Sequence, residues 1–208
     1  LQAKTTSLRE AVDWPQPAPP TWIAASVHPG EWPMVLEAFR TLRNGFATAR
    51  LVLVPRHPER FRAAREAAEA EGWTVRSRSQ SSGPASYDVL IGDTMGELMA
   101  MFGLGQIALV GGSLVPIGGH NVLEPAALGM PVLFGPHRQS FRAAGDALVE
   151  AGGGWEIHDA PTLAAQITKL WTNTETARAA GAAAREVVRR NQGAVTRAVA
   201  AVDAIEVV

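Results

Sequence analysis

The stretch that decides the fold is Val110–His137, which reads VGGSLVPIGGHNVLEPAALGMPVLFGPH. The apolar run Ile107–Val110 enters it and has the length and β-branched content of a buried strand. After a glycine-rich loop, Asn121 is typical of a helix start. Pro131–Phe134 then predicts the next strand. The stretch therefore indicates a strand, a glycine-rich loop, a short helix and a second strand.

The loop in this unit suits an anion. Two glycine pairs, Gly111-Gly112 and Gly118-Gly119, bracket a segment that bulky side chains would obstruct. Such a loop aims backbone N–H groups and a helix N-terminus at one point. An alternative stays open, in which the glycines serve packing and Glu124 only caps its helix. A Walker loop is excluded because no lysine lies here, and Ser113 is not in a Gly-x-Ser-x-Gly elbow.

Composition sets broad limits on the class of protein. The 208 residues carry 19 basic and 20 acidic side chains, so bulk charge does not indicate a nucleic-acid or membrane surface. The absence of cysteine excludes disulfides and thiolate metal sites and favours an intracellular location. No apolar stretch has the length of a transmembrane helix, and no signal peptide is recognisable. Because the chain begins at Leu1 with a proline-rich lead-in, we expect a piece of a longer protein.

Strands and helices alternate along the remaining sequence. Strands are expected at Thr21–Ser26, Arg50–Val54, Thr74–Arg78, Tyr87–Ile91 and Gly154–Ile157. Helices are expected at Trp32–Arg43, Arg60–Ala70, Met95–Met101, Phe141–Ala151 and Ala160–Trp171. A flexible loop is expected over Ser79–Ser86, and the tail Glu175–Ile205 is expected to be helical with a break near Gly193.

This alternation predicts an α/β fold: a Rossmann-like parallel sheet with helices on both faces. Three units are expected, namely a linker or hinge lead-in over 1–20, a Rossmann-like domain over 21–172 and a helical tail over 173–208. In such sheets ligands bind at the carboxyl edge of the strands.

Four of the five histidines follow predicted strands, and we therefore expect them along that edge. They are His28, His57, His120 and His137. Their spacing does not match a metal site, so we expect them to donate hydrogen bonds to a phosphate or carboxylate. Arg56 adds a planar fork for an anion, although a surface salt bridge with Glu59 is an alternative.

Carboxylates on the presumed edge are scattered over several loops. They are Glu31, Asp93, Glu97 and Glu124. Of these, Glu124 could accept hydrogen bonds from a ribose diol, as acidic residues do in nucleotide sites.

Four motifs in one order resemble bacterial 3-deoxy-D-manno-octulosonic acid (Kdo) transferases. They are Ala24–Glu31, Val54–Arg60, Gly92–Leu98 and Val110–Ala127, and Asn191–Ala194 resembles the C-terminal region of that family. The resemblance implies the C-terminal half of a GT-B glycosyltransferase, the half that holds the CMP-Kdo donor. It implies that no catalytic residue lies in this chain, because the proposed base belongs to the N-terminal half.

The resemblance also implies a donor site. Its residues would be Arg56, His57, Thr94, Met95, Gly96, Ser113, Gly118, Gly119, His120, Asn121 and Glu124. No metal and no cofactor are implied. The full-length enzyme would transfer Kdo, with inversion, to a lipid A precursor in lipopolysaccharide biosynthesis at the cytoplasmic face of the inner membrane. The chain alone would be soluble and inactive, and no nucleic-acid partner is expected.

Two competing hypotheses remain from the sequence. The chain could be the donor half of a related UDP-sugar transferase or epimerase, which would prefer a uracil nucleotide. It could also be a nucleotide-binding module without catalysis.

Overall fold

The computed structural model describes residues 1–80, 82–84 and 86–205, with side chains through 191. Seven parallel strands form one sheet in the order β3-β4-β2-β1-β5-β6-β7. Their bounds are β1 Thr21–Val27, β2 Arg50–Pro55, β3 Val75–Ser77, β4 Val89–Ile91, β5 Ile107–Val110, β6 Val132–Phe134 and β7 Gly154–Glu156. The predicted α/β class with a parallel sheet is confirmed.

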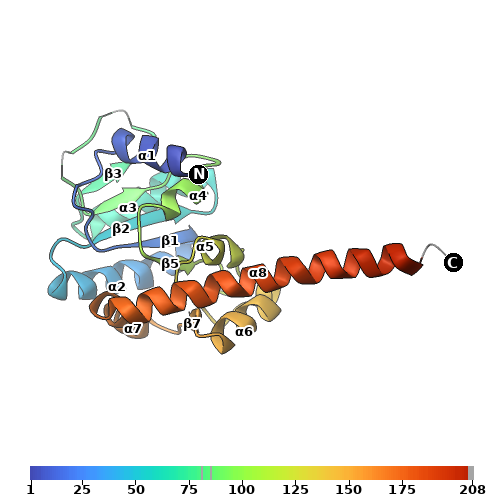
Figure 1. Ribbon diagram of the computed structural model, residues 1–208. Helices are drawn as coiled ribbons and strands as arrows, with labels where there is room; N and C mark the ends of the chain where they lie inside the picture. The colour runs from blue at the N-terminus through green and yellow to red at the C-terminus, as the bar shows by residue number, and fades with distance from the viewer. Residues whose placement is uncertain (81, 85, 206–208) are drawn as a thin grey trace.

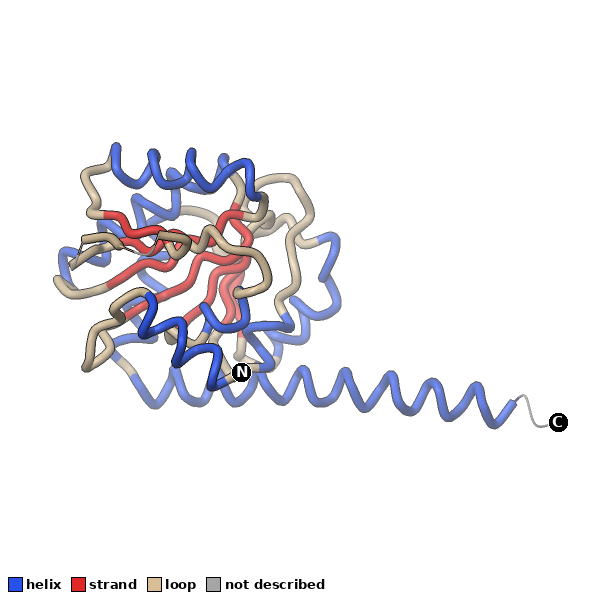
Figure 2. The backbone as a smooth tube through the Cα atoms, turned by 90° about the horizontal axis from the view of Figure 1, so that it is seen from above, coloured by secondary structure: helices blue, strands red, loops and turns tan. Residues whose placement is uncertain are grey.

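Helices cover both faces of the sheet, which forms the middle layer in Figure 2. The α-helices are α1 Gln2–Ala11, α2 Trp32–Gly45, α3 Phe61–Ala70, α4 Leu98–Phe102, α5 Leu123–Ala127, α6 Arg142–Glu150, α7 Ala160–Thr172 and α8 Thr174–Ile205. Short 3₁₀ turns are η1 Pro29–Glu31, η2 Pro58–Arg60 and η3 Gln139–Phe141. Helices α2, α3 and α7 pack on one face, and α1, α4, α5, α6 and α8 pack on the other.

The five inner strands are apolar along most of their length because each is buried on both sides. In β1, Trp22 and Ala24 join the core beneath α2 and α7, whereas Ile23 and Ala25 join the core beneath α4. Successive side chains of a strand point to opposite faces, so both sets must be apolar in a sheet with helices on each side. This explains why the strand signals in the sequence were strong.

The centre of the sheet is the point where the chain reverses its direction of winding. β1 pairs with β2 on one side and with β5 on the other. The loops after β1 and β5 therefore open a crevice at the carboxyl edge, where ligands bind in folds of this type. The β1–β2 register shifts between Ala25 and Val27, and the intervening Ser26 adopts a φ of 55°, which is rare outside glycine.

Residues 1–20, expected as a linker lead-in, differ from that expectation in their first part. Residues 2–11 form α1, which packs against α4 (Figure 1). Val12 and Trp14 are buried, and the Tyr87 hydroxyl donates to the Val12 carbonyl at 2.7 Å. The proline-rich composition indicated flexibility, but the few apolar side chains before it are enough to attach the segment to the sheet.

Helix α4 begins later than the expected Met95. Residues 94–96 form a turn instead, in which Gly96 has a φ of +77° that a helix does not allow. The Thr94 hydroxyl donates to the Glu97 carboxylate and closes this turn. The loop expected over Ser79–Ser86 contains residues 81 and 85, which lie outside the described residues.

The long helix α8 runs along α5, α6 and α7 and then extends past the sheet (Figure 1). It passes through Gly193 without the break expected there. Residues 206–208 of the expected tail lie outside the description. Within the described residues, no helix combines the length and apolar character needed to cross a bilayer.

Candidate functional site

A pocket of about 280 Å³ opens at the crevice between β1 and β5. Its lining comes from the ends of β1 and β5, from the loops after β2 and β5 and from helices α4 and α5. It consists of Ala25, Ser26, Arg56, Leu98, Phe102, Val110, His120, Asn121 and Glu124. Four of the predicted donor-site residues therefore meet here, namely Arg56, His120, Asn121 and Glu124. The site combines an apolar floor with a few convergent polar groups, which is the usual character of a small-molecule site.

The glycine-rich loop after β5 is held by a buried carboxylate. Glu31 is fully buried and accepts three backbone N–H groups. Its Oε2 accepts from His28 and from Gly112, each at 2.8 Å, and its Oε1 accepts from Leu114 at 3.0 Å. Because charge-assisted hydrogen bonds are about twice as strong as neutral ones, this carboxylate fixes the β5 loop against the β1 loop.

Two glycines of the loop are required by its shape. Gly112 has a φ of +69°, and a Cβ there would lie 2.9 Å from His120 Nε2. Gly119 has a φ of +82°, and a Cβ there would lie 2.2 Å from a ring carbon of Phe141. The Gly119 N–H donates to the Gly112 carbonyl at 2.7 Å and so brings the two ends of the loop together. The loop thus delivers His120 to the pocket.

Three of the four expected edge histidines contact one another. His28 Nε2 and His120 Nε2 are 2.8 Å apart, and the ring centres of His28 and His57 are 5.6 Å apart. His137 also follows its strand, and its backbone N–H donates to the Ser113 carbonyl at 2.9 Å. The prediction that four histidines follow strands at the carboxyl edge is confirmed, and the structure brings His57 and His120 against His28.

Burial is the main cause that lowers the pKa of two rings of this cluster, His28 and His120. Burial lowers the pKa of His120 to about 4, and His28, Arg56 and His57 add to the shift. Burial also lowers the pKa of His28, although the Glu31 carboxylate opposes that change. At neutral pH His120 is a neutral imidazole beside a permanently charged guanidinium.

Helix α5 presents the acidic side of the pocket. Asn121 Oδ1 accepts from the Leu123 N–H at 3.0 Å, which confirms the predicted helix start. Asn121 Nδ2 donates to Glu124 Oε1 at 3.2 Å. Glu124 therefore both braces the helix start and lines the pocket, so the cap and ribose interpretations remain compatible with the geometry. The Arg56–Glu59 ion pair is not found among the described residues, and Arg56 lines the pocket.

Two predicted site residues have structural surroundings. Ser113 is fully buried; its hydroxyl donates to the Val110 carbonyl at 2.6 Å and accepts from the Gly135 N–H at 2.8 Å. It therefore joins the ends of β5 and β6. Gly118 has a φ of +106°, and its carbonyl accepts from the Ser140 N–H at 3.0 Å. Their donor-binding roles stay predictions.

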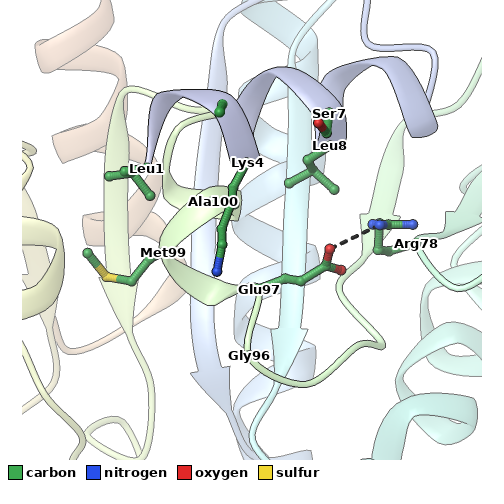
Figure 3. Close-up of a pocket in the computed structure, with 10 residues that line it drawn as sticks. Leu1, Lys4, Ser7, Leu8, Arg78, Gly96, Glu97, Met99 and Ala100 are labelled. Atoms are coloured by element: carbon green, nitrogen blue, oxygen red, sulfur yellow. Dashed lines mark hydrogen bonds and ion pairs between the residues drawn. The ribbon is translucent and has the colours of Figure 1, made fainter.

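The loop with Thr94, Met95 and Gly96 is at the mouth of a different and larger cavity. This cavity of about 680 Å³ lies between α1 and α4. Figure 3 shows Lys4 and Leu8 from α1 directed toward α4, with the Arg78–Glu97 ion pair at 3.0 Å beside them. Gly96 lines it, whereas Met95 is 67% exposed. We place the functional site in the smaller pocket because that one lies at the β1–β5 crevice and gathers the cationic and polar groups.

Sequence reasoning placed His28 at the edge but missed its contact with His120, and it missed the roles of Ser26 and Glu31. Glu31 was recognised only as one of several scattered carboxylates, yet its spacing from His28 is that of a capping box. That signal could have placed its carboxylate on a backbone N–H. Ser26 gave no comparable signal, because its left-handed φ depends on the strand register. Among the described side chains, no group of three or more His, Cys, Asp or Glu could hold a metal ion.

A comparison with solved structures identifies the class of protein to which the fold belongs. A C-terminal domain of a glycosyl transferase group 1 family protein (LpcC) from Francisella tularensis has the same fold. The TM-score is 0.60 at 10% identity, over 88% of this chain and 91% of that one. With the ligand crevice at the β1–β5 switch point, the fold is that of the C-terminal half of a GT-B glycosyltransferase. No protein-family model matches the chain.

Two further comparisons define the family. The chain is 41% identical over 199 residues to the 3-deoxy-D-manno-octulosonic acid transferase of Haemophilus influenzae, which covers 95% of this chain and 46% of that protein. It also matches the C-terminal CMP-Kdo binding domain of WaaA from Acinetobacter baumannii, with a TM-score of 0.83 and 29% identity over 90% of this chain and 99% of that one. The chain belongs to the Kdo transferase family and corresponds to its C-terminal half; it spans about half the length of the Haemophilus relative.

Replacing Glu31 by Gln should lower the free energy of unfolding by about 1.5–3 kcal/mol, because one of the three amide donors would then face an NH₂ group. The matched control is Glu37→Gln, since Glu37 lies exposed on the next helix and should change stability by less than about 0.5 kcal/mol. Urea unfolding measures both. Equal stability of the two variants would contradict the role assigned to the Glu31 carboxylate.

Proposed function

We propose that the β1–β5 pocket binds the nucleotide part of CMP-Kdo and that the chain is the donor half of an inverting Kdo transferase. The observation that carries this proposal is the convergence of Arg56, His120, Asn121 and Glu124 on one pocket. Arg56 comes from the loop after β2, His120 and Asn121 come from the loop after β5, and Glu124 lies in helix α5. The name of the matching Acinetobacter domain supports the choice of ligand.

The residue types in the pocket suit the two polar parts of a nucleotide. Arg56 offers a planar set of donors for phosphate oxygens, and His120 lies beside it. On the other side, the Glu124 carboxylate can accept two hydrogen bonds from the 2′- and 3′-hydroxyl groups of a ribose. In the proposed site the phosphate lies toward Arg56 and the ribose toward α5.

Transfer of Kdo would leave CMP with an additional negative charge on its phosphate. Fixed donors around that phosphate stabilise the charge as it develops, without a covalent intermediate. Arg56 carries a permanent charge for this purpose. The Thr94–Gly96 turn follows β4 at the same edge of the sheet, and we assign it to the cytosine side of the donor.

The acceptor would be a lipid A precursor, held and deprotonated by the remainder of a longer protein. This part of the proposal rests on the half-length match to the Haemophilus relative. The full-length enzyme would act at the cytoplasmic face of the inner membrane in lipopolysaccharide biosynthesis. The chain alone would bind the donor and transfer no Kdo.

Titration calorimetry with CMP and UMP tests the proposed function. CMP should bind with a Kd on the order of micromolar to millimolar, because this half supplies only one wall of a cleft. UMP should bind more weakly. No heat with CMP would contradict the proposal, and tighter binding of UMP would favour a UDP-sugar enzyme instead.

Glu124→Ala distinguishes the ribose role from a helix cap. The unmodified protein should prefer CMP over 2′-deoxy-CMP by about 1.5–3 kcal/mol, as expected of a charge-assisted hydrogen bond, and the variant should lose most of this preference. Measuring the binding of both ligands to both proteins isolates the interaction free energy between Glu124 and the 2′-hydroxyl group.

The control for this cycle is Glu59→Ala, an exposed carboxylate on the β2–α3 loop outside the pocket lining. It should keep the preference for CMP. If Glu124 acts only as a cap, its removal should cost about 0.5–2 kcal/mol of stability and leave the preference unchanged.

A further inference from the structure

The contact between His28 and His120 is a hydrogen bond between ring edges. Their planes differ by only 10°, and their ring centres are 5.1 Å apart. Rings packed face to face could not bring two nitrogens to the observed 2.8 Å, since that is shorter than the separation of stacked rings. One Nε2 therefore donates its proton to the lone pair of the other.

This geometry fixes the number of protons on the pair in the free protein. Because the two Nε2 atoms share a single proton, one of the two must carry no proton of its own and act as the acceptor. The low pKa of both rings makes the whole pair neutral at pH 7. The pair can gain a proton without losing its hydrogen bond, because the neutral donor ring carries a second nitrogen, Nδ1, that can be protonated.

The charged groups around the pair come from every loop packed against it. Arg56 and the edge of His57 lie on the β2 side, and Glu31 lies behind His28, where its carboxylate accepts the backbone N–H of His28. Glu124 shares the pocket with His120. In the free protein the cation and the burial together outweigh the carboxylates, so no proton is added.

We propose that the His28–His120 pair takes up one proton from solvent when a phosphate dianion enters the pocket, so that nucleotide binding is coupled to protonation. This inference rests on the proposed function and adds His28 as a positioning residue behind His120. The proton forms an N–H bond at the Nδ1 of the donating ring. The imidazolium then donates through Nε2 to its neutral partner, and no other bond changes.

The size of the electrostatic effect decides which ligands trigger the uptake. One negative charge at hydrogen-bond range raises the pKa of a partly buried imidazole by about three units. From a pKa of about 4 for free His120, a monoanion reaches only the neutral range, whereas a dianion passes well beyond it. A phosphodiester donor therefore leaves the pair only partly protonated, and the CMP dianion that departs protonates it fully.

The coupling has a definite sign. The pKa of the pair is higher with nucleotide bound than without it. The affinity for nucleotide therefore falls as the pH rises from the pKa of the free pair toward the pKa of the bound pair. CMP affinity should fall about three- to tenfold between pH 7 and 8, where its phosphate is already a dianion.

Titration calorimetry of CMP at pH 7.5, repeated in buffers of different ionisation enthalpy, measures the proton uptake. The expected uptake is between about one half and one proton per CMP. Cytidine 5′-(methyl phosphate), a monoanion, should bind with little uptake. His28→Gln should still bind CMP but lose the uptake, while the control His158→Gln, an exposed ring beside Glu156, should keep it.

The outcomes separate the two proposals. CMP binding without proton uptake in the unmodified protein would overturn the coupling and leave the proposed function standing. Undiminished uptake in His28→Gln would overturn the role of the pair. Absence of CMP binding would instead overturn the proposed function.

Discussion

The site depends on the buried carboxylate of Glu31, which accepts hydrogen bonds from three backbone N–H groups. A buried charge is tolerated only where its hydrogen-bonding capacity is filled, and here the filling groups are amides of the β1 and β5 loops. The interaction therefore ties together the two loops on either side of the crevice where the sheet reverses its winding. It adds to the backbone hydrogen bond from the Gly111 N–H to the Ala25 carbonyl, at 2.8 Å, which holds the start of the glycine-rich segment against β1.

The conformation of that segment determines what can enter the pocket. A left-handed Gly112 leaves space for the His120 ring, and the contact of Gly119 with Phe141 keeps the far end of the loop down on the sheet. Arg56 and Glu124 then line the same pocket together with apolar side chains. A guanidinium and a carboxylate within one small pocket suit a phosphate joined to a ribose, which connects the fold to the proposed donor.

Much of this architecture was predictable because strands buried on both faces must be continuously apolar. Ile107–Val110 and Pro131–Phe134 showed that pattern, and Asn121 marked a helix start that the structure confirms. The roles of Glu31 and Ser113 were not predictable in the same way. Both are polar residue types that usually lie at the surface, and only the tertiary approach of distant backbone groups makes them buried acceptors.

The two ends of the chain show the same limit of sequence reasoning. The lead-in before β1 had the composition of a linker, yet Leu8 and Trp14 are buried against the domain. Gly193 suggested a helix break, but an isolated glycine costs only about 1 kcal/mol relative to alanine, which neighbouring helical residues can offset. Tertiary contacts and long cooperative helices override local composition in both places.

The central claim is that the β1–β5 crevice, and not the larger cavity between α1 and α4, is the nucleotide site. Backbone amide chemical shifts recorded by NMR during addition of CMP test it most directly. The account predicts the largest changes at Ser26, Arg56 and the loop 111–121, with small changes at Lys4, Ser7 and Met99. Chemical-shift changes centred on Lys4, Ser7 and Met99, with none in the loop 111–121, would contradict it.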